Sequence, residues 1–205
     1  MIRHRMTTAL KRLGQDQTGA TIVEFALITP ALMVVLMGLF DLAYNMYTNE
    51  MLNGAVQQAA RMSTVEGAAG RQEQIDSGVV AAVRAVAPGA NMTFSRKAYA
   101  GFSDVNRSED WDDADNDGTC NNGEAFEDAN DNGTWDASAG TNGLGGARDA
   151  VLYSVSIDYP RLFPIFAFLP GQTETYSLST STVLRNQPYD AQAVNPNPPT
   201  GNCTE

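Results

Sequence analysis

The chain has few of the residue types on which most catalytic and metal sites depend. A single histidine, His4, and two cysteines, Cys120 and Cys203, occur among its 205 residues. The histidine lies within the first few residues, which excludes Ser-His-Asp and Cys-His catalysis and any histidine-based metal site in the body of the protein. Two cysteines are too few for a disulfide scaffold or a cysteine-rich zinc site.

Basic residues are scarce as well, and they are unevenly placed. The 13 Lys and Arg residues stand against 24 Asp and Glu residues, so the net charge is −11. No stretch forms a basic stripe, and the acidic balance argues against a nucleic-acid-binding protein. Residues 1–19 nevertheless carry four basic residues and one acid, whereas residues 104–136 carry 12 acids and one base. The chain therefore begins with a basic segment and holds a strongly acidic block in its middle.

The longest apolar stretch follows the basic segment. Residues 20–40, ATIVEFALITPALMVVLMGLF, contain one charged residue, Glu24. About 20 apolar residues in a helix cross the roughly 30 Å hydrocarbon core of a bilayer. The preceding basic segment predicts a single span with the N-terminus in the cytoplasm and the rest exported. A cleaved secretory signal is the alternative, but it requires a shorter apolar core and an A-x-A-like site, which does not follow here.

The start of this stretch resembles the processing site of type IV prepilins. The residues are Gly19-Ala20-Thr21-Ile22-Val23-Glu24-Phe25, and Glu24 is the fifth residue when Ala20 is the first, as in that family. Residues 19–30, GATIVEFALITP, are similar to the opening of TadE-like proteins, the minor pilins or pseudopilins of the tight-adherence (Flp) pilus. The similarity continues in residues 53–61 and returns in residues 183–189, where Gln187 stands in place of the acid that the family carries.

The resemblance implies how this motif works. A prepilin peptidase would cut after Gly19, and the Glu24 carboxylate of one subunit would neutralise the new Ala20 amine of a neighbour. The physics agrees, because a buried charge needs a partner and such a pair sets the register between subunits. The implied partners are the peptidase, other pilin or tight-adherence subunits and the inner membrane, with the exported part in the periplasm, at the cell surface or in an extracellular pilus.

Hydrophobic periodicity predicts an α+β fold. The long helix is expected to continue through residues 41–65, and a second amphipathic helix is expected at residues 72–87. Strands predicted at residues 91–99, 151–159 and 175–184 suffice for a small antiparallel sheet packed on the long helix. The residues expected to form the buried stripe of the helix are Leu42, Met46, Leu52, Val56, Ala59 and Ser63.

Two further segments complete the expected organisation. Residues 163–170, FPIFAFLP, form an unusually aromatic turn, which either contacts a partner subunit or the membrane surface, or folds over the sheet as core. The chain after Arg185 is rich in Pro and Asn and is expected to be loose. The expected segments are a leader (1–19), the spanning and continuing helix (20–66), a second helix and first strand (67–103), an acidic calcium-binding insertion (104–146), C-terminal strands (147–190) and a flexible tail (191–205).

The acidic block contains a repeat. WDDADNDGTCN at residues 111–121 and FEDANDNGTWD at residues 126–136 are offset by 15 residues. The first copy satisfies the twelve-residue calcium-loop pattern, with oxygen-bearing residues at alternate positions, Gly118 sixth and an acid twelfth. Such hard oxygen ligands suit Ca²⁺. The expected ligands are Asp113, Asp115, Asp117, Thr119, Asn121 and Glu124 in loop one, and Asp128, Asn130, Asn132, Thr134 and Asp136 in loop two.

The second loop lacks its last ligand. Its twelfth position is Ala139, so we expect a weaker site, or one completed from elsewhere, with Glu127 or Asp112 as guesses. Only three residues separate Glu124 from Asp128, too few for a helix between the loops. The arrangement therefore resembles the back-to-back loops of dockerin-like or thrombospondin-type calcium repeats. A solvated acidic linker is the alternative.

The cysteines leave two possibilities open. Cys120 lies inside loop one and Cys203 lies in the tail, and an exported location permits a disulfide between them. A buried Cys120 with a free Cys203 is as compatible with the sequence.

Three functions follow from these features. The first is a non-enzymatic minor pilin or pseudopilin, cut after Gly19, with a calcium-stabilised exported region. The second is an uncleaved, signal-anchored exported protein whose calcium block is an adhesive or sensing module. The third and weakest is an exported carboxylate-based hydrolase, because the chain offers acids but no compact catalytic motif, and those acids are already placed as calcium ligands.

Overall fold

The structure is a computed structural model, and it describes residues 19–168, 170–190, 192 and 198–204. The leader expected at residues 1–18 lies outside the described residues. The chain divides into two units, which we describe separately: residues 1–45 with 161–174, and residues 46–160 with 175–205. The long helix α2 contributes residues to both units.

Helix α2 (Ala20–Ser63) has 44 residues, so the predicted span and its continuation form one helix. Pro30 lies inside it, and the chain leaves it shortly before Gly67, whose φ of 77° requires glycine-like freedom. In the second unit, the helix buries Leu52, Val56, Ala59 and Ala60. The expected stripe is wrong at its start, because Leu42 and Met46 are exposed and the polar residues Asp41, Asn45 and Thr48 are buried instead.

The second unit contains the predicted antiparallel sheet. Its main strands are β1 (Asn91–Tyr99), β4 (Ala150–Pro160) and β5 (Thr175–Arg185), and a short edge strand, β3 (Thr141–Asn142), gives the order β3-β1-β4-β5. The alternation predicted for β4 is confirmed, because every second side chain is at most 4% exposed. These buried residues are Val151, Tyr153, Val155, Ile157 and Tyr159. The fold class is α+β, with the helix packed against an antiparallel sheet.

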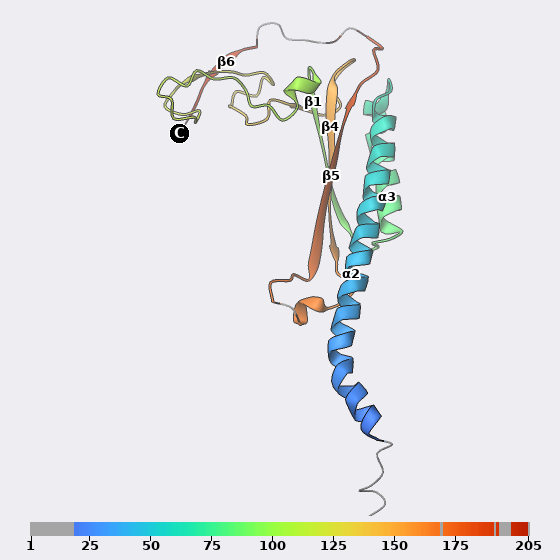
Figure 1. Cartoon of the computed structure of the whole chain (residues 1–205). Helices are drawn as coiled ribbons and strands as arrows, with labels where there is room; N and C mark the ends of the chain where they lie inside the picture. The colour runs from blue at the N-terminus through green and yellow to red at the C-terminus, as the bar shows by residue number, and fades with distance from the viewer. Residues whose placement is uncertain (1–18, 169, 191, 193–197, 205) are drawn as a thin grey trace, which may run out of the picture. The chain divides into compact units, whose positions relative to one another are not determined.

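Helix α3 (Gln72–Arg84) lies beside α2 along this sheet (Figure 1). It buries Ile75, Val79 and Val83, as the periodicity predicted. Asp76 of α3 pairs with Arg96 of β1, and the Tyr153 hydroxyl of β4 donates to Asp76 at 3.0 Å. Burial and the neighbouring Asp76 raise the pKa of Tyr153, so the neutral phenol is the form that this contact favours. Helix α2 is joined to the sheet by a hydrogen bond that the Thr180 hydroxyl of β5 donates to the side-chain oxygen of Asn53 in α2.

The acidic block lies between β1 and β4 in the chain. It contains the 3-10 helix η2 (Phe102–Asp104) at its start and strand β2 (Ala125–Glu127), which pairs with β6 (Thr200–Asn202) near the C-terminus. The expectation of a loose tail is therefore wrong at residues 200–202, because backbone pairing with β2 orders them. The apolar core of the block is small: Phe126 is 2% exposed, and Trp111 packs edge-on against Trp135 with ring centroids 5.3 Å apart.

Candidate functional site

The N-terminal motif lies at the start of α2. Ala20 is the first residue of the helix, Gly19 precedes it, and the Glu24 side chain is exposed. The following apolar side chains are exposed as well, and Ile22 and Leu27 expose 72% and 77% of their surface. By length and composition, α2 is long and apolar enough to cross a membrane. The described part of the chain therefore leaves this apolar surface without protein cover, as a bilayer or a neighbouring helix would require.

Loop one brings three predicted ligands together. Oxygen atoms of Asp113, Asp115 and Asp117 lie within 4.8 Å of one another. The Asp113 carboxylate accepts hydrogen bonds from the backbone N–H groups of Asp117 and Gly118, both at 3.1 Å. Gly118 has a φ of 77°, which is the reason that the sixth position needs glycine. These bonds turn the backbone around the carboxylate cluster.

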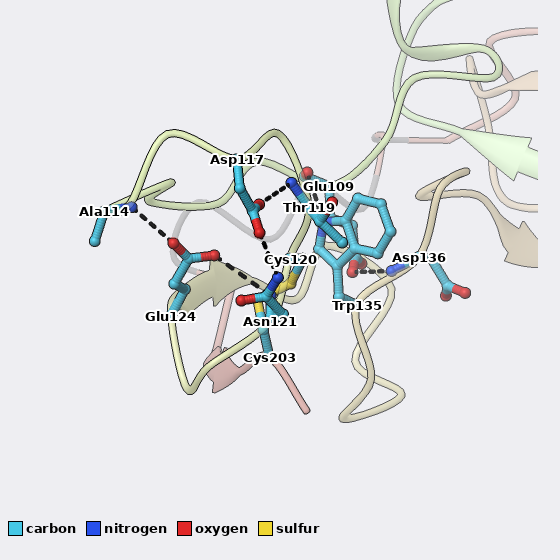
Figure 2. Close-up of a disulfide and its surroundings, with 10 residues drawn as sticks. All are labelled: Glu109, Ala114, Asp117, Thr119, Cys120, Asn121, Glu124, Trp135, Asp136 and Cys203. Carbon is cyan, nitrogen blue, oxygen red and sulfur yellow. Dashed lines mark hydrogen bonds between the residues drawn. A yellow bond between two sulfur atoms is a disulfide. The ribbon is translucent and has the colours of Figure 1, made fainter. Parts of the chain in front are cut away.

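Glu124 links two backbone positions of loop one through its carboxylate. Its side chain is nearly buried, with the residue 9% exposed. One carboxylate oxygen accepts from the Ala114 N–H at 2.7 Å, and the other from the Asn121 N–H at 3.4 Å (Figure 2). These donors are the second and ninth positions of the loop, so the twelfth-position acid holds both ends of its own loop.

Loop two repeats this backbone path 15 residues later. The Asp128 carboxylate accepts from the N–H groups of Asn132 at 3.0 Å and Gly133 at 2.7 Å, the fifth and sixth positions of the loop. Gly133 has a φ of 78°, as Gly118 has 77°. Asn130, Asn132 and Asp136 line a cavity of about 240 Å³ together with Lys97 and the 140–142 segment. The structure therefore supports the second loop as an equivalent of the first.

Glu109 takes the position in loop two that Glu124 takes in loop one, and the sequence reasoning did not find it. Its carboxylate accepts from the Ala129 N–H at 3.0 Å and from the Asp136 N–H at 2.9 Å. These are again the second and ninth positions of the loop, the two that Glu124 holds in loop one. Asp112 and Glu127, the residues guessed for this role, are exposed and do not take this place. Figure 2 shows Glu109 directed at Asp136, with Trp135 beside it.

An antiparallel bridge places each of these two acids beside the first residue of the loop that it holds. Trp111 pairs with Phe126, and the neighbouring backbone bonds join Asp112 to Ala125 and Glu127 to Asp110. In this register, two residues further along, Glu124 stands opposite Asp113 and Glu109 stands opposite Asp128. Each acid thus precedes one loop in the sequence and serves the other loop in space. A signal existed: Glu109-x-Trp111 and Glu124-x-Phe126 share the 15-residue offset of the repeat.

Two carboxylates at loop two are buried without a cationic partner among the described residues. Glu109 is 1% exposed and Asp128 is 3% exposed, and no described Lys or Arg side chain forms an ion pair with either. Burial and, to a lesser degree, the charge of Asp128 raise the pKa of Glu109, while the backbone N–H groups oppose that shift. In addition, the side-chain amide oxygens of Asn121 and Asn130 are buried and have no hydrogen-bond partner among the described residues. Buried oxygens of this kind are satisfied when they coordinate a cation.

Cys120 and Cys203 form a disulfide, which decides between the two possibilities that the sequence left open. The bond links residues 83 positions apart, with a Cα–Cα distance of 5.3 Å. Around it, the Cys203 N–H donates to the Glu124 carbonyl at 2.8 Å, and Gly201 of β6 lies against the Phe126 ring. The tail therefore fastens loop one at the residue that closes it (Figure 2).

These features define a class of protein: a chain with an apolar N-terminal helix, an α+β region and a disulfide-bonded acidic insertion. Comparison with protein families then shows that residues 19–61 are similar to TadE-like protein. This match begins at Gly19 and ends two residues before the end of α2, so the sheet and the acidic insertion lie outside it. No curated protein and no solved structure matches the chain.

Proposed function

We propose that this protein is a minor pilin or pseudopilin of a tight-adherence pilus, anchored in the inner membrane with its N-terminus in the cytoplasm and its bulk exported. The observation that carries the proposal is the TadE-like segment at residues 19–61, whose apolar half is exposed along α2. The role is structural and not enzymatic, as the similarity suggests. The disulfide supports export, because such bonds persist in oxidising compartments.

Processing after Gly19 is the first testable part of this proposal. The cut would leave Ala20 as the new N-terminus and Glu24 as the carboxylate that pairs with the amine of a neighbouring subunit. Intact-mass measurement of the membrane form, with and without a co-expressed prepilin peptidase, tests it. We expect loss of residues 1–19 only with the peptidase. A variant with Gly19→Ile should stay uncut, whereas Glu24→Gln should be cut and fail to assemble; an uncut wild-type chain would contradict the proposal.

We infer further that both loops of the insertion bind Ca²⁺. In loop one, the ligands would be carboxylates of Asp113, Asp115, Asp117 and Glu124, with the Thr119 carbonyl and Asn121. In loop two, they would be Asp128, Asn130, Asn132, Thr134 and Asp136, with Glu109 as the closing acid. The ions would neutralise the clustered carboxylates and would be coordinated by the amide oxygens of Asn121 and Asn130, which have no other partner among the described residues. The insertion would then be ordered outside the cell, where calcium is abundant.

Calorimetry can test the assignment of Glu109. The full chain should bind two Ca²⁺ ions, and Glu109→Gln should weaken one site by at least about tenfold, since charge and bidentate ligation set affinity in such loops. The matched control is Glu127→Gln, the same change at the guessed and exposed neighbour, which should leave both sites intact. Equal effects of the two variants would exclude Glu109 as a ligand. Absence of calcium binding by the wild-type chain would exclude the loops altogether.

An alternative function is favoured by one observation: the insertion lies outside the TadE-like match. On this alternative the protein is an uncleaved, signal-anchored exported protein whose calcium block mediates adhesion or sensing. It predicts activity without pilus genes and no effect of Glu24→Ala. Deleting the genes for the pilus ATPase and scoring calcium-dependent adhesion separates the two functions.

A further inference from the structure

The segment between β4 and β5 carries an apolar surface that the proposed function does not use. Residues 162–168, LFPIFAF, contain no charged residue. Ile165 is buried, but Leu162 and Phe168 expose 57% and 59% of their surface. Large apolar side chains exposed together on a short segment mark a contact with something outside the chain.

This segment is fastened to one level of α2. Arg161 Nη1 lies 2.6 Å from Asp41 Oδ2, and both side chains are at most 8% exposed. The Phe163 ring packs on the Phe40 ring with centroids 6.3 Å apart. The Arg161 guanidinium also donates to the Thr173 carbonyl and the Gln172 side chain, which closes the segment on itself. The segment and the part of α2 up to Asn45 belong to the same unit, and Figure 1 shows the segment beside this part of the helix.

That level of α2 is the outer end of the apolar run. Residues 20–40 rise about 31 Å at 1.5 Å per residue, which matches the roughly 30 Å hydrocarbon core. Asp41 is the first charged residue after Glu24, and its carboxylate is paired with Arg161 instead of being left to water or lipid. A paired charge can lie close to the hydrocarbon boundary where a single charge is costly. If residues 20–40 span the bilayer, the ion pair falls at the level of the headgroups.

We propose that residues 162–168 form a second membrane contact, inserting Leu162 and Phe168 into the outer interface of the bilayer beside the exit of α2. The inference rests on the membrane span of the proposed function. A lipid occupant is favoured over a protein because the apolar surface is continuous with the span through the Phe40–Phe163 contact. The contact would fix the depth at which α2 leaves the membrane.

Depth-dependent quenching in lipid vesicles tests this proposal. The full-length chain is reconstituted in phosphatidylethanolamine–phosphatidylglycerol vesicles with lipids brominated at shallow or deep acyl positions. Phe168→Trp and Leu162→Trp are two independent reporters, so that one can fail to fold without ending the test. Leu32→Trp marks the middle of the span, and Tyr189→Trp is the matched control, because Tyr189 is an exposed aromatic residue of the other unit. Trp111 and Trp135 give the common baseline.

We expect shallow bromolipids to quench the added fluorescence of Phe168→Trp and Leu162→Trp at least about twofold more than that of Tyr189→Trp, as for aromatic groups at an interface. Deep bromolipids should quench Leu32→Trp most. Quenching of Leu32→Trp with both loop reporters at the Tyr189→Trp level would overturn the second contact and leave the span. A blue-shifted loop reporter without lipid quenching would show that a second copy covers the segment and would also overturn it. If Leu32→Trp is not quenched, the span fails and this inference fails with it.

Discussion

The sheet region and the acidic insertion differ in the kind of side chain that they bury. In the sheet, the most deeply buried side chains are apolar, including Ala150, Val155 and Ile157 of β4. In the insertion, Phe126 is joined by three buried carboxylates, those of Glu109, Glu124 and Asp128. Burial of apolar surface stabilises a fold under most solution conditions, whereas clustered carboxylates stabilise one only when something neutralises them. The comparison predicts that one region is robust and the other conditional, in a single chain.

Removing calcium should give the largest difference between the two regions. With EGTA, we expect the insertion at residues 104–146 to become at least about tenfold more sensitive to protease, because its carboxylates then repel one another. The sheet strands should keep their resistance. Asp113→Ala with Glu124→Ala should reproduce the effect with calcium present. Equal cleavage of the insertion with and without the ion would remove the contrast.

The disulfide should matter next, and only for the insertion. Replacing Cys120 and Cys203 by Ser frees the tail that pairs through β6, and loss of such a bond costs about 2–5 kcal/mol. Hydrogen exchange should speed up in β2 and β6 and remain unchanged in β1 and β4. A uniform loss of protection over both regions would mean that the bond stabilises the sheet as well as the insertion, and would contradict the difference between the two regions.

The sheet should respond to the loss of apolar volume whether or not calcium is present. Ile157→Ala removes a fully buried side chain and should lower the free energy of unfolding by about 2–5 kcal/mol. Thermal unfolding followed by circular dichroism, with calcium and with EGTA, measures it. The decrease should be the same in both buffers. A decrease that appears only in EGTA would show that the ion stabilises the sheet as well.

The smallest effect is an alkaline one in the sheet. The folded-state pKa of Tyr153 is raised, so the fold favours the neutral phenol, and this stabilisation is present below the ordinary pKa of about 10 and decreases as the pH rises above it. Tyr153→Phe removes the hydrogen bond to Asp76 and should cost about 1 kcal/mol at neutral pH. It should also flatten the loss of stability above pH 10. An unchanged alkaline slope in Tyr153→Phe would assign that slope to other groups.

Local patterns in the sequence were sufficient for the two long helices, the three long strands and the carboxylate cluster of loop one, but not for the short strands β2, β3 and β6. The helix beginning at Ala20, the alternation of β4 and the spacing of Asp113, Asp115 and Asp117 each depend on neighbours within a few residues. Chain-local physics controls such features. The predicted buried stripe of α2 was wrong at Leu42 and Met46, which are exposed. Asp41 is buried instead, in an ion pair with Arg161, which lies 120 residues away in the chain.

The sequence by itself determined the apolar run, the charge division, the longer α and β elements and the oxygen-bearing residue types of the repeat. Only the tertiary structure decided that Glu109 accepts hydrogen bonds from loop two, that Cys120 pairs with Cys203 and that Phe163 packs on Phe40. The physical reason is the same in each case. Periodicity and spacing report which residues lie on one face of one element, but long-range partners depend on the register in which distant segments meet. A 15-residue repeat left that register open until the Trp111–Phe126 bridge set it.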